Sequence, residues 1–290
     1  MRRFPPLVAL LLSLIAACAT ETPETPVAAP APMTTVAEPS PTARATPRAQ
    51  LVVRPPAPTW VVGASPLPLG PSGFGLVLPT PKVLRNRTLP TLDVLPPPRD
   101  AAFHATTGTI TPALRSRIGG AYQPGCPVPL ADLRYLTLPF HGFDGRAHTG
   151  ELVVAATATS KTVRAFRRLY ALRFPIEQMT LATGDDLNAP PTGDGNTSGA
   201  FICRRARGLT RFSAHACGLA IDVNPFNNPY IRRGLVLPEL ASAYVDRHWI
   251  RPGMFLRGSA AVHAFTDQGF TWGGDFRSLK DYQHFSLTGN

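Results

Sequence analysis

Residues 213–222 read Ser-Ala-His-Ala-Cys-Gly-Leu-Ala-Ile-Asp, a string in which a histidine and an aspartate flank a glycine. His215 and Asp222 are too far apart for one helical turn, and Gly218 between them has the conformational freedom that a turn needs. The apolar run at 219–223 predicts a short buried strand that carries Asp222 inward. A lone carboxylate is costly to bury in such surroundings, so it needs a partner, and a metal ion is one such partner.

A second string near the C-terminus, Asp281-Tyr-Gln-His284, places another carboxylate and another imidazole on one side of a turn. Two neutral imidazoles and one carboxylate form a three-ligand zinc site that leaves one position open. His215, Asp222 and His284 are the predicted ligands, and Asp281 is placed to take a proton from water. Taken singly, His215 is explained as a hydrogen-bonded structural histidine and Asp222 as a cap of the turn that follows it. The joint pattern favours the metal.

Hydrophobic patterning predicts an α+β domain with a mainly antiparallel sheet and flanking helices. Strands are expected at 132–138, 151–155, 176–182, 219–223 and 285–287, and the first two are expected to form a hairpin. Helices are expected at 161–174 and 259–268, where apolar residues recur at helical spacing. Ser160 and Ser259 are their expected N-caps.

The N-terminal region has the composition of an export signal. Arg2 and Arg3 precede an apolar run at 7–17 that is too short to span a bilayer. The run ends in Leu-Ile-Ala-Ala-Cys, which resembles the bacterial lipoprotein signal with Cys18 as the lipidated residue; the alternative is an ordinary signal peptide. We therefore expect a signal at 1–18, a proline-rich low-complexity spacer at 19–100, and a compact domain at 101–290 with its core at about 125–287.

Proline dominates the expected spacer, because 21 of the 33 prolines of the chain lie before residue 100. Residues 19–48 hold almost no large apolar side chain, so they cannot offset the entropy of ordering and are expected to stay extended. Residues 51–100 are more apolar. They either pack on the domain as an irregular strap or continue the extended spacer, and the sequence leaves both open.

The chain is basic, with a formal net charge of +11 and a pI of about 10.2. A basic chain attracts nucleic acid or another anionic polymer. Because the expected signal directs the protein out of the cytoplasm, we expect the polymer to be an anionic cell envelope and not nucleic acid. We expect a monomer.

These strings resemble the zinc D-alanyl-D-alanine carboxypeptidase and dipeptidase family, which also contains phage endolysin L-alanyl-D-glutamate peptidases. The resemblance covers about residues 125–287 and includes Gly125-Cys-Pro-Val, Asp222-Val-Asn-Pro, Trp272-Gly-Gly-Asp and Asp281-Tyr-Gln-His. It implies a hedgehog/DD-peptidase-like zinc peptidase domain. In this family zinc is held by residues at the positions of His215, Asp222 and His284. Asp281 would act as general base and then as general acid to the leaving amine.

The resemblance also suggests roles beyond the metal ligands. Arg204 takes the place of the family's arginine that stabilises the oxyanion, with Arg205 and Arg207 as alternatives. Ser213 would orient the loop that carries the first histidine. Asp275 would accept a hydrogen bond from a metal-ligating histidine and so orient its ring.

The resemblance and the expected export together suggest a disulfide. If Cys18 is lipidated, three thiols remain, and an exported protein is expected to pair two of them. Cys126 and Cys203 are the expected pair because both lie in family-like strings; the alternative joins Cys203 to Cys217. In the first case Cys217 would be free or would compete for the metal.

The expected function is that of an exported, lipid-anchored zinc peptidase that cuts peptidoglycan stem peptides next to a D-amino acid and releases terminal D-alanine. The alternatives are an L-alanyl-D-glutamate endopeptidase and an inactive, metal-bound cell-wall binding module. Asp281 and Arg204 argue against a binding module, since a binder needs no general base. A serine hydrolase built on Ser213 and His215 lacks the G-x-S-x-G elbow.

Overall fold

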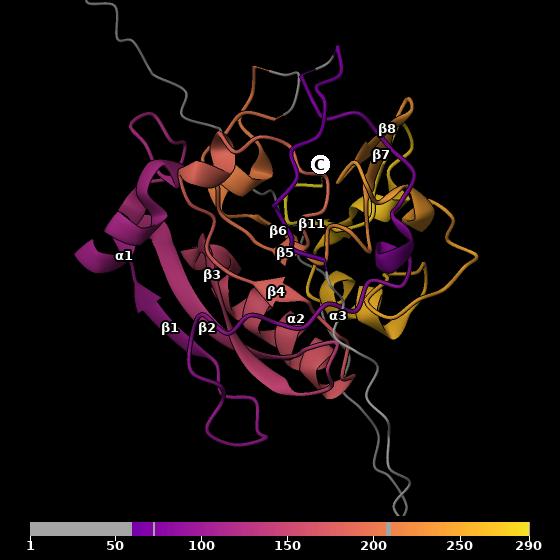
Figure 1. The fold of residues 1–290 in the computed structure, drawn as a ribbon. Helices are drawn as coiled ribbons and strands as arrows, with labels where there is room; N and C mark the ends of the chain where they lie inside the picture. The colour runs from indigo at the N-terminus through magenta and orange to yellow at the C-terminus, as the bar shows by residue number, and fades with distance from the viewer. Residues whose placement is uncertain (1–59, 72, 207–209, 290) are drawn as a thin grey trace, which may run out of the picture.

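The computed structural model describes residues 60–71, 73–206 and 210–289, which form an α+β structure of short helices and small sheets (Figure 1). The expected signal peptide, Cys18 and the first part of the spacer lie outside these residues. Within the described ranges, no helix has the length and apolar character needed to cross a bilayer.

A long antiparallel hairpin frames the fold. Its strands are β2 (Leu133–His141) and β3 (Ala147–Ala155), which pair along their whole length. The turn between them contains Gly145 with φ of 76°, a conformation that glycine adopts without strain. A further strand, β1 (Thr106–Thr109), pairs with β2. The predicted hairpin is confirmed, and both of its strands are longer than expected.

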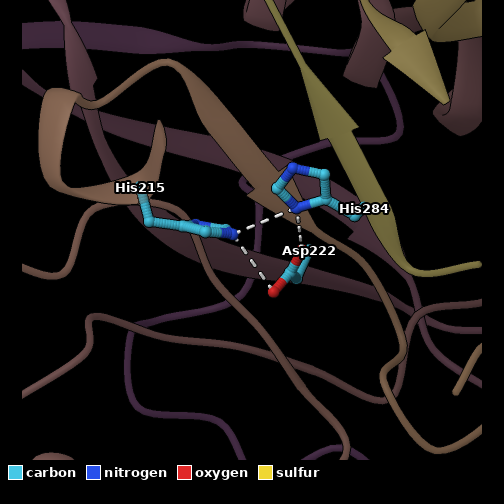
Figure 2. Close-up of side chains that lie close together, drawn as sticks. All are labelled: His215, Asp222 and His284. Carbon is cyan, nitrogen blue, oxygen red and sulfur yellow. Dashed lines mark hydrogen bonds and ion pairs between the residues drawn. The ribbon is translucent and has the colours of Figure 1, made fainter. Parts of the chain in front are cut away.

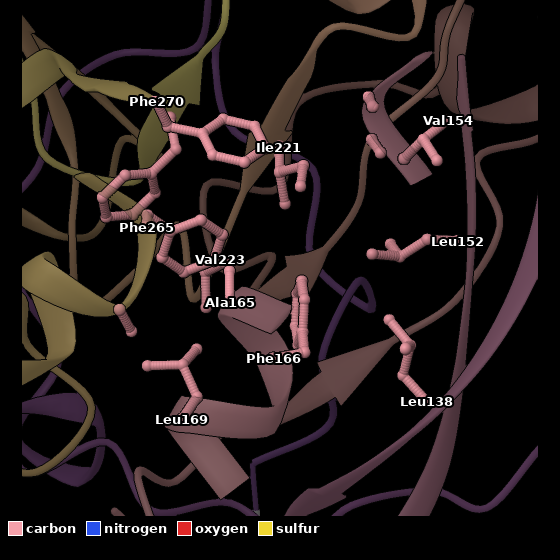
Figure 3. Packing of buried hydrophobic residues seen from close by; sticks show 14 of the residues in the cluster. Leu138, Leu152, Val154, Ala165, Phe166, Leu169, Ile221, Val223, Phe265 and Phe270 are labelled. Carbon is pink, nitrogen blue, oxygen red and sulfur yellow. The ribbon is translucent and has the colours of Figure 1, made fainter. Parts of the chain in front are cut away.

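One helix packs on the hairpin and a second helix packs on the first, and together they enclose the main core (Figure 3). They are α2 (Thr159–Ala171) and α3 (Ala260–Thr266). Each large apolar side chain buried here contributes about 1.5–3 kcal/mol. The core joins the hairpin, both helices and the C-terminal strands through Leu138, Leu152, Val154, Phe166, Leu169, Ile221, Phe265, Phe270 and Phe285.

The two helices begin differently. Ser259 caps α3 as predicted, because its hydroxyl accepts a backbone N–H from the first turn at 3.3 Å. In contrast, α2 begins at Thr159 directly after a 3-10 turn, so Ser160 lies inside the helix and is not its N-cap. The same helix ends at Ala171, before the predicted residue 174, because Arg173 adopts the left-handed conformation with φ of 51°.

The other strands are short and form three further sheets instead of one continuous sheet. The first contains β6 (Ala220–Asp222), β11 (His284–Ser286) and β9 (Thr271–Trp272), all antiparallel. The second contains β10 (Lys280–Asp281), β7 (Tyr230–Arg232) and β8 (Leu235–Leu237), also antiparallel. The third pairs β4 (Gln178–Met179) with β5 (Thr197–Ser198) in parallel. The strand predicted at 176–182 is thus reduced to β4, and neither the β7–β8 hairpin nor α1 (Pro112–Ile118) was predicted.

Residues 60–100, here called the strap, pack against the domain beside the segment that follows β8 (Figure 1). Leu84 and Leu89 are buried with Phe226 and Tyr244 in a second hydrophobic cluster. Thr80 donates a hydrogen bond to the carbonyl of Leu240 at 2.6 Å. The boundary expected at residue 100 therefore does not mark where packed structure begins, and the irregular strap is the alternative that the structure contains.

A buried ion pair fastens the strap. Arg87 donates from Nε and from one terminal nitrogen to the two carboxylate oxygens of Glu177, both at 2.7 Å, and the two side chains are 0% and 7% exposed. Asn196 donates to the same carboxylate at 2.7 Å. Loss of one partner would leave the other charge buried and unpaired, which is the costly way to break such a pair.

We predict that Arg87→Ala lowers the free energy of unfolding by about 3–5 kcal/mol, because it leaves the Glu177 carboxylate buried without its cation. The matched control is Arg99→Ala, since that side chain is 77% exposed and should change stability by less than about 0.5 kcal/mol. Denaturant unfolding of the whole chain measures both. Equal stability of the two variants would show that the strap is not part of the cooperative unit.

Candidate metal centre

Three side chains from different elements converge in the C-terminal half of the chain (Figure 2). His215 lies in a 3-10 turn, Asp222 ends β6, and His284 begins β11. Nδ1 of His284 is 2.9 Å from Oδ1 of Asp222 and 3.2 Å from Nε2 of His215. The same Nε2 is 3.3 Å from Oδ2 of Asp222. The structure thus brings together the three residues that the sequence predicted as ligands.

Strand pairing places two of the three. In the antiparallel pair β6–β11, Asp222 lies directly opposite His284. Residues that face each other in this way have Cβ atoms about 5 Å apart, so their side chains meet on one face. The short distance between these two groups therefore follows from the register of the backbone.

The turn that holds His215 depends on its two ends. Ser213 accepts the backbone N–H of His215 at 3.3 Å, so its hydroxyl orients the turn, as the resemblance implied. Gly218 closes the turn with φ of 67°. A Cβ at Gly218 would lie 2.5 Å from the backbone nitrogen of Ala155 on β3. Only glycine therefore lets this turn dock against the hairpin.

A backbone carbonyl sets the tautomer of His215. Its Nδ1 is 2.6 Å from the carbonyl oxygen of Ala200, which only accepts, so Nδ1 carries the proton and Nε2 presents its lone pair to the group. The donor set is two imidazole nitrogens and one carboxylate oxygen, all within 4.8 Å of one another. These atoms fit a divalent metal ion with three protein ligands and one open position.

The two aspartates of the site experience opposite shifts. Burial alone would raise the pKa of Asp222, but the charges and hydrogen bonds of His215 and His284 outweigh it and hold that pKa well below its usual range. Burial is the main cause that raises the pKa of Asp281 to about 6; the attraction of His284 opposes the rise and the nearby Asp222 carboxylate adds to it. The Asp222 carboxyl is thus kept ionised, and the pKa of the Asp281 carboxyl is brought close to neutral pH.

Gly273 makes room for the backbone of Asp281. Asp281 ends β10, and its Oδ1 accepts a hydrogen bond from Gln283 at 3.1 Å. Gly273 lies beneath it, and a Cβ there would be 2.4 Å from the Asp281 carbonyl oxygen and 2.9 Å from its Cβ. The glycine in Trp272-Gly273 therefore makes room for the second carboxylate.

The site opens into a cleft of about 770 Å³ whose walls include Asp281, Arg204 and the strap residues Gly73 and Phe74. Arg204 is half-buried. Its alternative Arg205 does not line the cleft, because it bonds to the carbonyl of Thr210 and packs over Phe212. Arg207, the other alternative, lies outside the described residues.

Two expectations are corrected here. Asp275 forms an ion pair with Arg257 at the surface, and within the described ranges it makes no hydrogen bond to a ligating histidine. Cys217 is neither free nor a member of the ligand group, since the described residues hold no free cysteine and its side chain is buried in the main core. Cys126 and Cys203, the expected pair, are joined by a disulfide.

Several supports of the site were not predicted. Ala200 contributes its backbone carbonyl, so the identity of its side chain does not indicate this role. Gly273 was noticed only as part of a motif, although two successive glycines after a tryptophan indicate a close backbone approach. Gly73 and Phe74 belong to a segment without a hydrophobic period, so no sequence pattern places them beside the cleft.

Comparison with known proteins supports the family resemblance. Residues 207–287 match the family model described as D-alanyl-D-alanine carboxypeptidase. The matched segment contains His215, Asp222, Asp281 and His284, whereas Arg204 and the strap lie before it. No curated protein and no solved structure matches the chain.

We predict that Asp281→Asn stabilises the metal-free protein at pH 8 and has no effect near pH 3. Because folding raises the pKa of this carboxyl to about 6, ionising it lowers the free energy of unfolding of the protein. This loss is absent at low pH, grows between the unfolded pKa and the folded pKa, and is complete above pH 6. The expected gain at pH 8 is on the order of 2 kcal/mol. Chemical unfolding with a chelator present measures it, beside the exposed control Asp132→Asn. A gain that is the same at both pH values would contradict the assigned shift.

We also predict that Gly273→Ala lowers stability by about 1–3 kcal/mol, because the new methyl group would overlap the Asp281 backbone. Gly108→Ala is the control, since a Cβ at Gly108 meets nothing within 4 Å. Metal affinity, measured by titration, should stay within a few-fold in both variants because the three ligands do not move. A Gly273→Ala variant as stable as the control would show that the contact is relieved without strain.

Proposed function

We propose that this protein is a zinc metallopeptidase, because residues 207–287 match the family model described as D-alanyl-D-alanine carboxypeptidase. It cleaves peptidoglycan stem peptides next to a D-amino acid and releases terminal D-alanine. The observation that carries the proposal is the convergence of two imidazoles and an ionised carboxylate beside a second carboxyl with a raised pKa, all in one cleft. Pairs of carboxyls whose environments separate their pKa values are typical of acid–base catalysis.

Each residue of the cleft has a task in peptide hydrolysis. His215, Asp222 and His284 hold the zinc ion. When bound, zinc polarises the scissile carbonyl and makes the attacking water a stronger acid. Asp281 accepts the proton of that water as the new C–O bond forms, and it returns the proton to the leaving amine as the C–N bond breaks. An Asp281 pKa raised to about 6 suits both steps near neutral pH.

Arg204 completes the proposed machinery. Its guanidinium lines the cleft and, among the described residues, its one hydrogen bond is to the carbonyl of Arg205 at 3.3 Å. A fixed cationic donor stabilises negative charge that develops on the carbonyl oxygen. A binding module would need neither this donor nor a base, which favours an enzyme over a metal-bound cell-wall binder.

We further propose that the protein acts outside the cytoplasm as a lipid-anchored envelope protein and works as a monomer. The N-terminal string ending at Cys18 supports export and lipidation. The net charge of +11 suits contact with an anionic wall polymer. That contact should weaken as ionic strength rises.

The proposal is tested by incubating the whole chain, loaded with zinc, with muropeptides that end in D-Ala-D-Ala and reading the products by mass spectrometry. We expect the loss of one alanine, abolished by chelator. Asp281→Asn should reduce the rate by at least about 100-fold while zinc remains bound. The exposed Asp132→Asn is the control and should retain the rate.

Each other outcome has a defined meaning. A cut between L-alanine and D-glutamate would keep the chemistry and replace the carboxypeptidase by an endopeptidase. Stoichiometric zinc with no cleavage of any muropeptide would overturn the enzyme and leave the cell-wall binder.

A further inference from the structure

Glu239 is a buried carboxylate in the wall of the same cleft. It follows β8 directly after Pro238 and is 5% exposed. Its Oε1 accepts the backbone N–H of Gly75, on the strap, at 2.9 Å. Among the described residues no lysine, arginine or histidine forms an ion pair with it.

The other buried carboxylates of the described structure are all compensated. Glu177 is paired with Arg87. Glu151 accepts from Arg117 and, at 2.7 Å, from Tyr135. Asp194 accepts from Trp60 at 2.8 Å, from Thr192 at 2.6 Å and from the backbone of Gly63. Glu239 has a single neutral donor.

The carboxylate of Glu239 lines the cleft with one neutral donor, and it gains a charge-assisted hydrogen bond when a cationic donor enters the cleft. The bond to Gly75 does not require the charge, because the amide oxygen of a glutamine would accept the same N–H. The charge of Glu239 is therefore unexplained by the fold. It is explained if a cation enters the cleft and completes the pair.

We propose that Glu239 is a subsite residue that binds a primary ammonium group of the substrate peptide, away from the bond that is cut. The proposal rests on the proposed function, since it names a feature of the peptide that the same cleft takes. Hydrogen bonds between ionised partners are roughly twice as strong as neutral ones, so this contact would select peptides that carry the amine. Arg204, Arg211 and Arg232 also line the cleft and suit the carboxylates of the same peptide.

Two amines can supply this group, namely the side-chain amine of a diamino residue in the stem peptide and the α-amine at its N-terminus. Both present the same chemistry to Glu239. They are distinguished by acetylating one at a time in otherwise identical peptides.

The test measures binding without turnover. The whole chain with Asp281→Asn, loaded with zinc, is titrated calorimetrically with a D-Ala-D-Ala peptide that has both amines free, and with its two singly acetylated forms. We expect one acetylation to weaken binding about tenfold and the other to have little effect, which identifies the amine. Adding Glu239→Gln should weaken binding of the free peptide about tenfold and remove the difference between the peptides.

The control is Asp185→Asn, which removes one negative charge from an exposed loop near the cleft and should leave the acetylation effect in place. Affinity that ignores both acetylations, no binding of any peptide, or an acetylation effect that survives Glu239→Gln would each overturn the subsite. Cleavage by the wild-type chain is followed separately. The enzyme can therefore be upheld while the subsite fails, and an amine preference in binding can persist where no peptide is cut.

Discussion

The antiparallel register of β6 and β11 is the constraint on which the site depends. It places Asp222 opposite His284, although 62 positions separate them in the chain. Both strands are only three residues long and would not pair stably alone. Their neighbours in the main core supply the stability, since Phe285 of β11 stacks on Phe265 of α3 with ring centroids 4.1 Å apart. The hairpin and the helices therefore serve the site by fixing one backbone register.

The electrostatics of the cleft follow from this arrangement. Asp222 stands between two imidazoles, which keep it ionised in spite of burial. Asp281 ends β10 in a separate sheet, and among the described residues no cationic side chain is in hydrogen-bond contact with it, so burial dominates and raises its pKa to about 6. The fold thus makes one aspartate a permanent anion suited to hold a metal and the other a group that exchanges protons near neutral pH. The difference lies in the partners of each carboxyl and not in its chemistry.

The sequence predicted the parts of the fold that local rules govern. The β2–β3 hairpin was visible as two apolar runs around a glycine turn, and Ser259 was visible as a cap. The four residues of the site were visible because their spacings are short. The strap was one of two alternatives that the sequence left open, because proline removes hydrophobic periodicity and the anchor of the strap pairs Arg87 with Glu177 across 90 residues. The roles of Gly273 and of the Ala200 carbonyl were not predicted for a related reason, since both depend on the backbone and not on a side chain.

Segments inside and outside the family match both contribute to the cleft. The matched residues 207–287 carry the metal ligands and Asp281. The strap lies before this segment, yet it supplies Gly73 and Phe74 to the wall and the one neutral donor to Glu239. The strap also bonds through Leu67 to the carbonyl of Pro191 in the loop on the same rim. The matched segment therefore carries the metal ligands, Asp281 and part of the cleft wall, and the strap completes that wall. A change in the strap can alter which peptide fits while the reacting groups stay in place, because β6 and β11 do not depend on it for their register.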